Sequence, residues 1–118
     1  MLNTIIVSNI TNEAASKTKG LVLKEHLEKL LSSHANNIVV DFNGITRFAS
    51  PFFNYSFAAL ALVYGFDTIR AIQIKNISPV GSDTFQTSIE NAEMVSQHPE
   101  NITKINNIID NTPKKVIL

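Results

Sequence analysis

The chain has 118 residues, of which 17% are charged and 44% are hydrophobic, an ordinary balance for one globular domain rather than a disordered chain. Ten basic and ten acidic residues cancel, which argues against a nucleic-acid binder because such proteins use excess positive charge to neutralise phosphates. The absence of cysteine excludes disulfides, thiolate zinc sites and cysteine nucleophiles.

No segment of the sequence has the pattern of a targeting or membrane-spanning element. The first apolar run, Ile5-Ile6-Val7, is too short for a signal peptide. The longest apolar run, near 57–64, falls well below the roughly 18–20 residues of a membrane span. We therefore expect a single cytoplasmic domain over residues 1–118, without a membrane partner.

The first half of the chain predicts a strand, a helix and a second strand. The β-branched run within 2–8 is typical of a strand. Leucines recurring at three- and four-residue steps predict a helix over 15–33, closed by the turn-tolerant residues 34–37. The continuous apolar run 38–42 predicts a central strand that is covered on both faces.

The second half repeats this alternation. It predicts a helix over 50–64 with Gly65 just past its end, an alternating strand over 71–77, a loop over 78–81 and a helix over 83–97. A short amphipathic helix is expected to follow Pro99, and 114–118 forms an edge strand or a tail. The fold class is thus α/β, a small single-layer sheet of parallel strands covered by helices in the order β-α-β-α-β-α, with 99–118 as C-terminal helix and tail.

The helix 50–64 is apolar on almost every side. One stripe holds Phe53 and Phe57, and a second holds Phe52, Tyr55 and Val63. A helix on a sheet needs one large apolar stripe, and leaving a second in water would forgo several kcal/mol, at about 1.5–3 kcal/mol per large side chain. Two interpretations stay open: the second stripe packs under the C-terminal isoleucine helix, or it forms a partner or dimer surface.

The start of this helix also admits two interpretations. Ser50 is predicted as the N-cap and Pro51 as the first helical residue, a good capping pair in its own right. A helix N-terminus also favours anions, so that Ser50 is a candidate phosphorylation or anion site.

The segment "NIVVDFNGITRFASPFF", its apolar helix and the later "IQIKNIS" resemble the STAS-like domain family of unknown function. That family is distantly similar to the sulfate-transporter and anti-sigma-factor-antagonist (STAS) domains. The resemblance covers roughly residues 1–95 and depends on the order of loose motifs. Its elements are the strand ending in Asp41-Phe42, Gly44-Ile45, the Ser50-Pro51 helix start with Phe53, and the strand ending at Asn76.

The resemblance implies a non-catalytic regulatory module that binds a protein partner, with an ATPase of the histidine-kinase-like fold as the expected kind of partner. It also implies a switch by phosphorylation of a serine at the start of the helix after the central strand, which Ser50 matches by position. The Asp-Ser-Ser-Gly sequence of the antagonists is here Ala49-Ser50-Pro51-Phe52. The residues expected to bind the partner or act as the switch are Asp41, Phe48, Ser50, Phe52 and Tyr55.

The sequence gives little support to catalysis. The three histidines, His26, His34 and His98, show no defensible order with a carboxylate and a nucleophile, and no metal-ligand spacing or glycine-rich phosphate loop occurs. No cofactor and no metal are expected. Asp41 closes the central strand, where we expect it to bind nearby loop amides. Two alternatives remain: a small enzyme or nucleotide- or anion-binding domain using a pocket beside Asp41 and Ser50, and a structural homo-oligomer, such as a homodimer, using the same helix.

Overall fold

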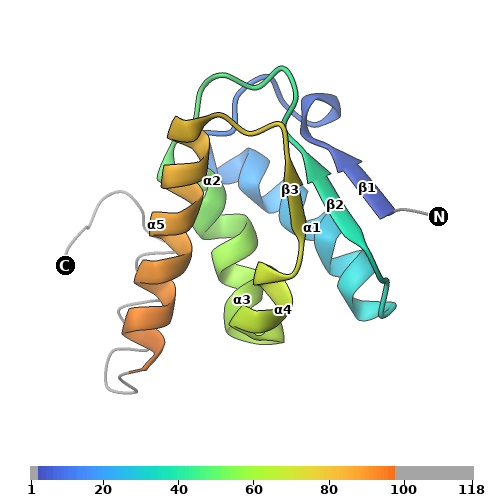
Figure 1. Ribbon diagram of the computed structural model, residues 1–118, viewed down its shortest axis with the longest axis vertical. Coiled ribbons are helices and arrows are strands. Elements are labelled where there is room, and N and C mark those ends of the chain that lie inside the picture. Colours follow the sequence, from blue (N-terminus) through green and yellow to red (C-terminus); the bar gives the residue numbers. More distant parts are fainter. Residues whose placement is uncertain (1–2, 98–118) are drawn as a thin grey trace.

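A computed structural model describes residues 3–97, which form a three-stranded parallel sheet and a layer of helices (Figure 1). The strands are β1 (Asn3–Ile6), β2 (Ile38–Asp41) and β3 (Gln73–Lys75), in the order β1-β2-β3. β1 and β3 both pair in parallel with β2, and Ile5, Val40 and Ile74 lie side by side. The predicted α/β class with parallel strands is therefore confirmed.

The helices follow the strands in the predicted alternation. The 3-10 turn η1 (Val7–Asn9) follows β1, and α1 (Lys17–Ser32) then returns along the sheet. α1 begins after Ser16, whose Oγ accepts the Lys19 N–H at 3.1 Å. It ends before His34 and Asn37, which both take positive φ values, as expected for turn-tolerant residues.

The second helical segment runs without a break from Ser50 to Tyr64, but its middle is not α-helical. It comprises α2 (Ser50–Phe53), the π-helical η2 (Asn54–Ala58) and α3 (Ala59–Tyr64). Within η2, the buried Ser56 hydroxyl donates to the Phe52 carbonyl at 2.7 Å, which gives a polar group in the core a partner. Gly65 follows with φ 100°, as predicted for the end of this helix.

The last two helices differ from the prediction. α4 (Phe66–Arg70) was not predicted, and α5 (Pro79–Ser96) begins four residues before the expected 83–97. The early start of α5 has a clear cause, because Ser78 accepts the Gly81 N–H at 3.2 Å and Pro79 occupies the first turn. The expected helix after Pro99 and the 114–118 segment lie outside the described residues.

The hydrophobic core lies between the sheet and the helices. Phe42 and Phe53 lie at its centre with Phe57 and Phe85, and their ring centroids are 5.0–6.2 Å apart along the series. Ile38 and Val40 of β2 join this core, whereas Val39 points to the opposite face. Val39 is nevertheless buried, with an exposed fraction of 2%, so that the side chains of β2 are buried on both faces of the strand, as expected.

Candidate functional site

The loops that follow β1 and β2 are joined backbone to backbone at the carboxyl end of the sheet. Ala14 and Phe48 form an isolated parallel bridge, in which the Ala14 N–H donates to Arg47 O at 2.9 Å and the Ala49 N–H donates to Ala14 O at 3.0 Å. An ion pair of 3.5 Å between Glu13 and Arg47 lies beside this bridge. The bridge therefore fixes the starts of α1 and α2 next to each other, at the edge where ligand sites of α/β folds form.

This bridge moves the start of α2 by one residue from the predicted position. Ala49, and not Ser50, is the N-cap: its backbone is extended (φ −148°, ψ 150°) and its carbonyl accepts the Phe52 N–H at 3.2 Å. The prediction that Ser50 caps the helix was wrong, because pairing with Ala14 holds Ala49 in the extended conformation that an N-cap requires. Ser50 is instead the first helical residue and is exposed.

The hydroxyl of Ser50 makes no hydrogen bond to any described residue, in contrast to the capping hydroxyls of Ser16 and Ser78. The Ser50 hydroxyl therefore does not cap the helix. Ser50 belongs to the first turn, whose N–H groups have no partner within the helix, and the helical segment continues to Tyr64. Chemically, this arrangement suits the addition of an anionic group to the Ser50 oxygen.

Phe52 and Tyr55 are not part of the surface. Their exposed fractions are 0% and 2%, so the expected surplus of apolar surface around residue 55 does not exist within one chain. α1 covers them: a Cβ on Gly20 would lie 2.5 Å from Phe52 O, and the Lys17 Nζ lies 5.0 Å from the centroid of the Tyr55 ring. The interpretation that these rings form a partner or dimer surface is thereby contradicted, since no ring is left uncovered.

The ring of Phe48 packs against the core. It is half-buried, with its centroid 6.0 Å from that of Phe42 and 6.3 Å from that of Phe53. The start of α5 closes over it, because a Cβ on Gly81 would lie 2.7 Å from the Phe48 ring. Of the expected site residues, only Ser50 is fully exposed.

Asp41 lies on the other face of the sheet from the helices. Side chains alternate between the two faces along a strand, so Asp41 lies on the same face of β2 as Val39, whereas Val40 points into the core. The Oδ1 atom accepts hydrogen bonds from the Asn43 N–H and from Nδ2 of Asn76, both at 2.9 Å. This confirms the expected role of binding loop amides. Asn76, with φ 57°, ties the end of β3 to the end of β2, a partner that the strand pattern did not predict.

The hydrogen bond from Asn76 has the larger effect and that from Asn43 the smaller, and both lower the pKa of Asp41 below its usual value. The positive charge of Lys75 lowers this pKa further. The native state therefore binds fewer protons than the unfolded state near the usual pKa of about 3.9. The stability that Asp41 contributes is complete above that pKa, and it is lost as the pH falls through the folded-state pKa.

We expect Asp41→Asn, which keeps an acceptor oxygen for both donors, to lower the urea midpoint at pH 6 and to change it far less near pH 3. Urea unfolding at the two pH values measures this difference, and Asp83→Asn on the exposed side of α5 provides the control. An equal shift at both pH values would contradict a role for the Asp41 charge.

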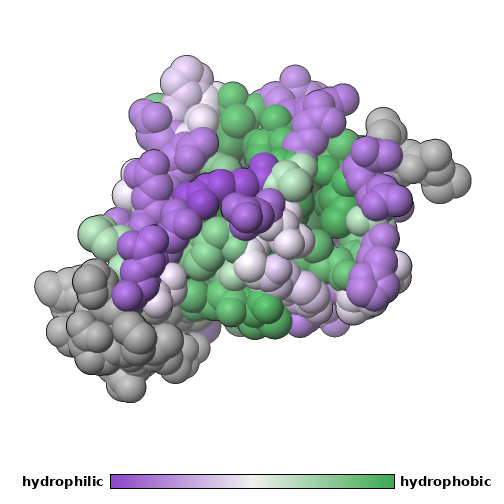
Figure 2. Space-filling model, turned by 60° about the horizontal axis from the view of Figure 1, so that its bottom comes forward, coloured by the Kyte–Doolittle hydropathy of each residue, from purple (hydrophilic) through white to green (hydrophobic). Residues whose placement is uncertain are grey.

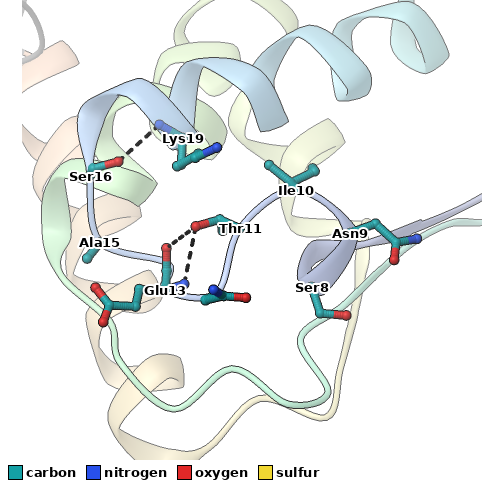
Figure 3. Close-up of a pocket in the computed structure, with 9 residues that line it drawn as sticks. Ser8, Asn9, Ile10, Thr11, Glu13, Ala15, Ser16 and Lys19 are labelled. Carbon is teal, nitrogen blue, oxygen red and sulfur yellow. Dashed lines mark hydrogen bonds between the residues drawn. The ribbon is translucent and has the colours of Figure 1, made fainter.

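A hollow of about 520 Å³ lies beside the start of α1 (Figure 3). It is lined by Ser8 to Glu13, Ala15, Ser16 and Lys19. Two of its hydroxyls are engaged in local turns: Thr11 Oγ1 donates to Glu13 O at 2.9 Å, and Ser16 caps α1. Asp41 and Ser50, beside which a shared pocket was expected, do not line this hollow.

The described residues contain neither a cluster typical of a metal site nor a membrane-spanning helix. Within them, no group of three or more His, Cys, Asp or Glu side chains could hold a metal ion, and His26 and His34 are both exposed. No helix between residues 3 and 97 is long and apolar enough to cross a membrane. His98 lies outside the described residues.

The comparisons with known proteins agree with this geometry. Residues 19–81, more than half of the chain, match the family described as STAS-like domain of unknown function. The match extends from the first turn of α1 to the first turn of α5 and includes the α2 start with Ser50. No curated protein and no solved structure matches the chain. With its parallel sheet, its helix order and this match, the chain belongs to the family of STAS-like domains of unknown function.

Proposed function

We propose that this protein is a non-catalytic regulatory module that binds a protein partner through the Ser50 edge and is switched by phosphorylation of Ser50. We define the Ser50 edge as the loop 43–49 with Ser50 and Pro51. The observation that carries the proposal is the exposed Ser50 hydroxyl, which makes no hydrogen bond to a described residue at the start of a long helix. An ATPase of the histidine-kinase-like fold is the proposed class of partner, on the strength of the family membership.

The chemistry of the switch follows from the position of Ser50. The Ser50 Oγ would attack the γ-phosphorus of ATP held by the ATPase partner, which acts as the kinase. The O–P bond forms while the bond to the β,γ-bridging oxygen breaks and ADP leaves, and the hydroxyl proton passes to a base of the partner. A dianionic phosphate at the first helical residue is stabilised by the helix dipole and by free N–H groups. It also brings negative charge to the surface that the partner would contact, which weakens binding of an acidic partner surface.

The exposed Ser50 makes the proposal testable without damage to the fold. We expect Ser50→Asp to raise the free energy of unfolding by about 0.3–1 kcal/mol, through the helix dipole, and to reduce recovery of the ATPase partner at least tenfold. Ser50→Ala should retain the partner but lose phosphate incorporation. The measurement is quantitative mass spectrometry of proteins and phosphopeptides after purification with the tagged chain from its own cells.

Thr87→Asp is the matched control, because it adds the same charge to an exposed position on α5. It should bind the partner as the wild-type chain does. Equal recovery of the ATPase with Ser50→Asp and Thr87→Asp would sink the switch, and the absence of any ATPase from all samples would sink the proposed partner.

A further inference from the structure

The hollow beside the start of α1 lies at the carboxyl end of the sheet, which is the end at which ligand sites of α/β folds form (Figure 1). The lower face of the molecule, at the opposite end, exposes apolar side chains among polar ones (Figure 2). The hollow is different, because Ile10 and Ala15 are the only apolar residues among the described residues that line it. Its surface therefore suits a polar ligand.

The size and the support of the hollow are those of a small-molecule site. Its volume of about 520 Å³ falls within the range of roughly 300–1,000 Å³ typical of such sites. Lys19 of α1 and the segment 8–16 provide the walls. Hydrogen bonds hold this segment in place, because Val7 O accepts the Ile10 N–H at 2.8 Å and Ala14 pairs with the loop before α2. The hollow is therefore formed before any ligand binds.

Lys19 supplies a positive charge to the hollow. Its side chain is half-buried, and its Nζ forms no ion pair or hydrogen bond with a described residue, whereas the Lys24 Nζ on the same helix lies 3.5 Å from Glu28 Oε1. Figure 3 shows the Lys19 side chain extending from α1 toward Ile10. Because a lysine ammonium binds phosphate groups as a point charge, this position favours an anionic group on the ligand.

Glu13 is the only acidic residue among the described residues that line the hollow, and it does not oppose an anion at Lys19. Its Oε2 lies 3.5 Å from Arg47 Nε, which balances the negative charge. Figure 3 shows the Glu13 carboxylate pointing away from the hollow. The charge that faces a ligand is therefore that of Lys19.

Two further polar side chains of the lining have hydrogen-bonding groups to offer. The Ser8 hydroxyl and the Asn12 amide are exposed and make no hydrogen bond to a described residue, in contrast to the hydroxyls of Thr11 and Ser16. Hydroxyl and amide groups both donate and accept, which matches the hydroxyls of a sugar. None of the described residues that line the hollow is aromatic, so that a nucleobase would find no ring on which to stack.

We propose that this hollow binds the phosphate monoester of a small sugar, with Lys19 at the phosphate and with Ser8 and Asn12 at the sugar hydroxyls. The positive charge of Lys19 attracts the phosphate, and the two polar side chains orient the sugar. No residue of the Ser50 edge lines the hollow, so this inference does not depend on the proposed function.

Isothermal titration calorimetry of the full chain with ribose 5-phosphate tests the site. We expect a submillimolar dissociation constant, and Lys19→Gln should raise it at least about tenfold because a charged hydrogen bond is lost. Asn12→Asp keeps the size of the side chain and adds a negative charge to the lining, so it should abolish binding. Lys29→Gln is the matched control: it removes the same charge from an exposed position near the other end of α1, and it should bind as the wild-type chain does.

A titration of the ¹⁵N-labelled chain with the same compound locates the ligand, because the amide shifts should be concentrated in residues 8–19. The absence of both heat and shifts would overturn the site. Equal affinities of Lys19→Gln and Lys29→Gln for ribose 5-phosphate would show that the ligand does not bind at Lys19. Free ribose, inorganic phosphate or adenosine monophosphate binding as tightly as ribose 5-phosphate would overturn the proposed class of ligand.

Discussion

Phe53→Ala is expected to lower the free energy of unfolding by about 3–5 kcal/mol, the largest effect of any single substitution considered for this chain. The Phe53 ring is fully buried, and its centroid lies within 6.3 Å of those of five other phenylalanine rings. Its truncation opens a cavity between the sheet, the Ser50–Tyr64 segment and α5, and small domains have only about 5–15 kcal/mol of stability in total. Urea unfolding at pH 7, followed by far-ultraviolet circular dichroism, measures the loss.

Phe53→Leu separates the cavity from the loss of ring contacts, because it keeps most of the apolar volume and should cost clearly less than Phe53→Ala. Val80→Ala, at an exposed position, should change the unfolding free energy by less than about 0.5 kcal/mol. If Phe53→Ala were as mild as Val80→Ala, the aromatic cluster would not be the centre of the core.

Gly20→Ala should destabilise the protein by about 1–3 kcal/mol, although alanine in a helix interior is normally more stable than glycine by up to about 1 kcal/mol. The reversal of sign follows from the approach of α1 to α2: the new Cβ would lie 2.5 Å from Phe52 O and 3.2 Å from Phe52 Cα. Both atoms belong to the backbone, so a whole helix must shift. Thermal and urea unfolding of the variant measure the effect.

Gly81→Ala provides the comparison for this effect. Its new Cβ would also meet close neighbours, at 2.7 Å and 2.8 Å, but these are side-chain atoms of Phe48 and Ile77. Side chains can rotate away where a helix backbone cannot, so Gly81→Ala should cost less than Gly20→Ala. A Gly20→Ala variant as stable as the wild-type chain would mean that α1 and α2 do not pack as closely as described.

The two ends and the middle of the Ser50–Tyr64 segment differ in what they expose. At the upper end Ser50 stands in water at the carboxyl edge of the sheet. The middle of the segment, including Phe52 and Tyr55, is enclosed by α1 and α5. At the lower end Val63 emerges again.

Local patterns were sufficient to predict the alternation of the strands with the long helices and the resemblance to the family. The β-branched runs around Ile5 and Ile38–Asp41 correctly predicted strands, and the leucines spaced three and four residues apart within 15–33 correctly predicted a helix. These patterns are informative because the spacing of apolar residues indicates which face of an element is buried. The left-handed residues His34 and Gly65 also lie where the sequence predicted a break. Each of these features depends on residues close in sequence.

The predictions that failed at the candidate site depend on contacts between distant segments. The Ser-Pro pair at 50–51 and the one at 78–79 look alike in sequence, yet only Ser78 caps its helix. The difference comes from Ala14, which pairs with Ala49 and sets the helix start. In the same way, the burial of Tyr55 is set by Lys17 and its helix, far away in the chain.

The sequence by itself determined the parallel α/β alternation, the resemblance to the STAS-like family and the place of Ser50 near the start of the second helical segment. Only the tertiary structure decided which apolar side chains reach the surface, which face of the sheet Asp41 occupies and which serine hydroxyl is left without a capping bond. Periodicity tells which residues share a face, but burial is a property of what packs against that face. For this chain the packing depends on the close approach of α1 at Gly20.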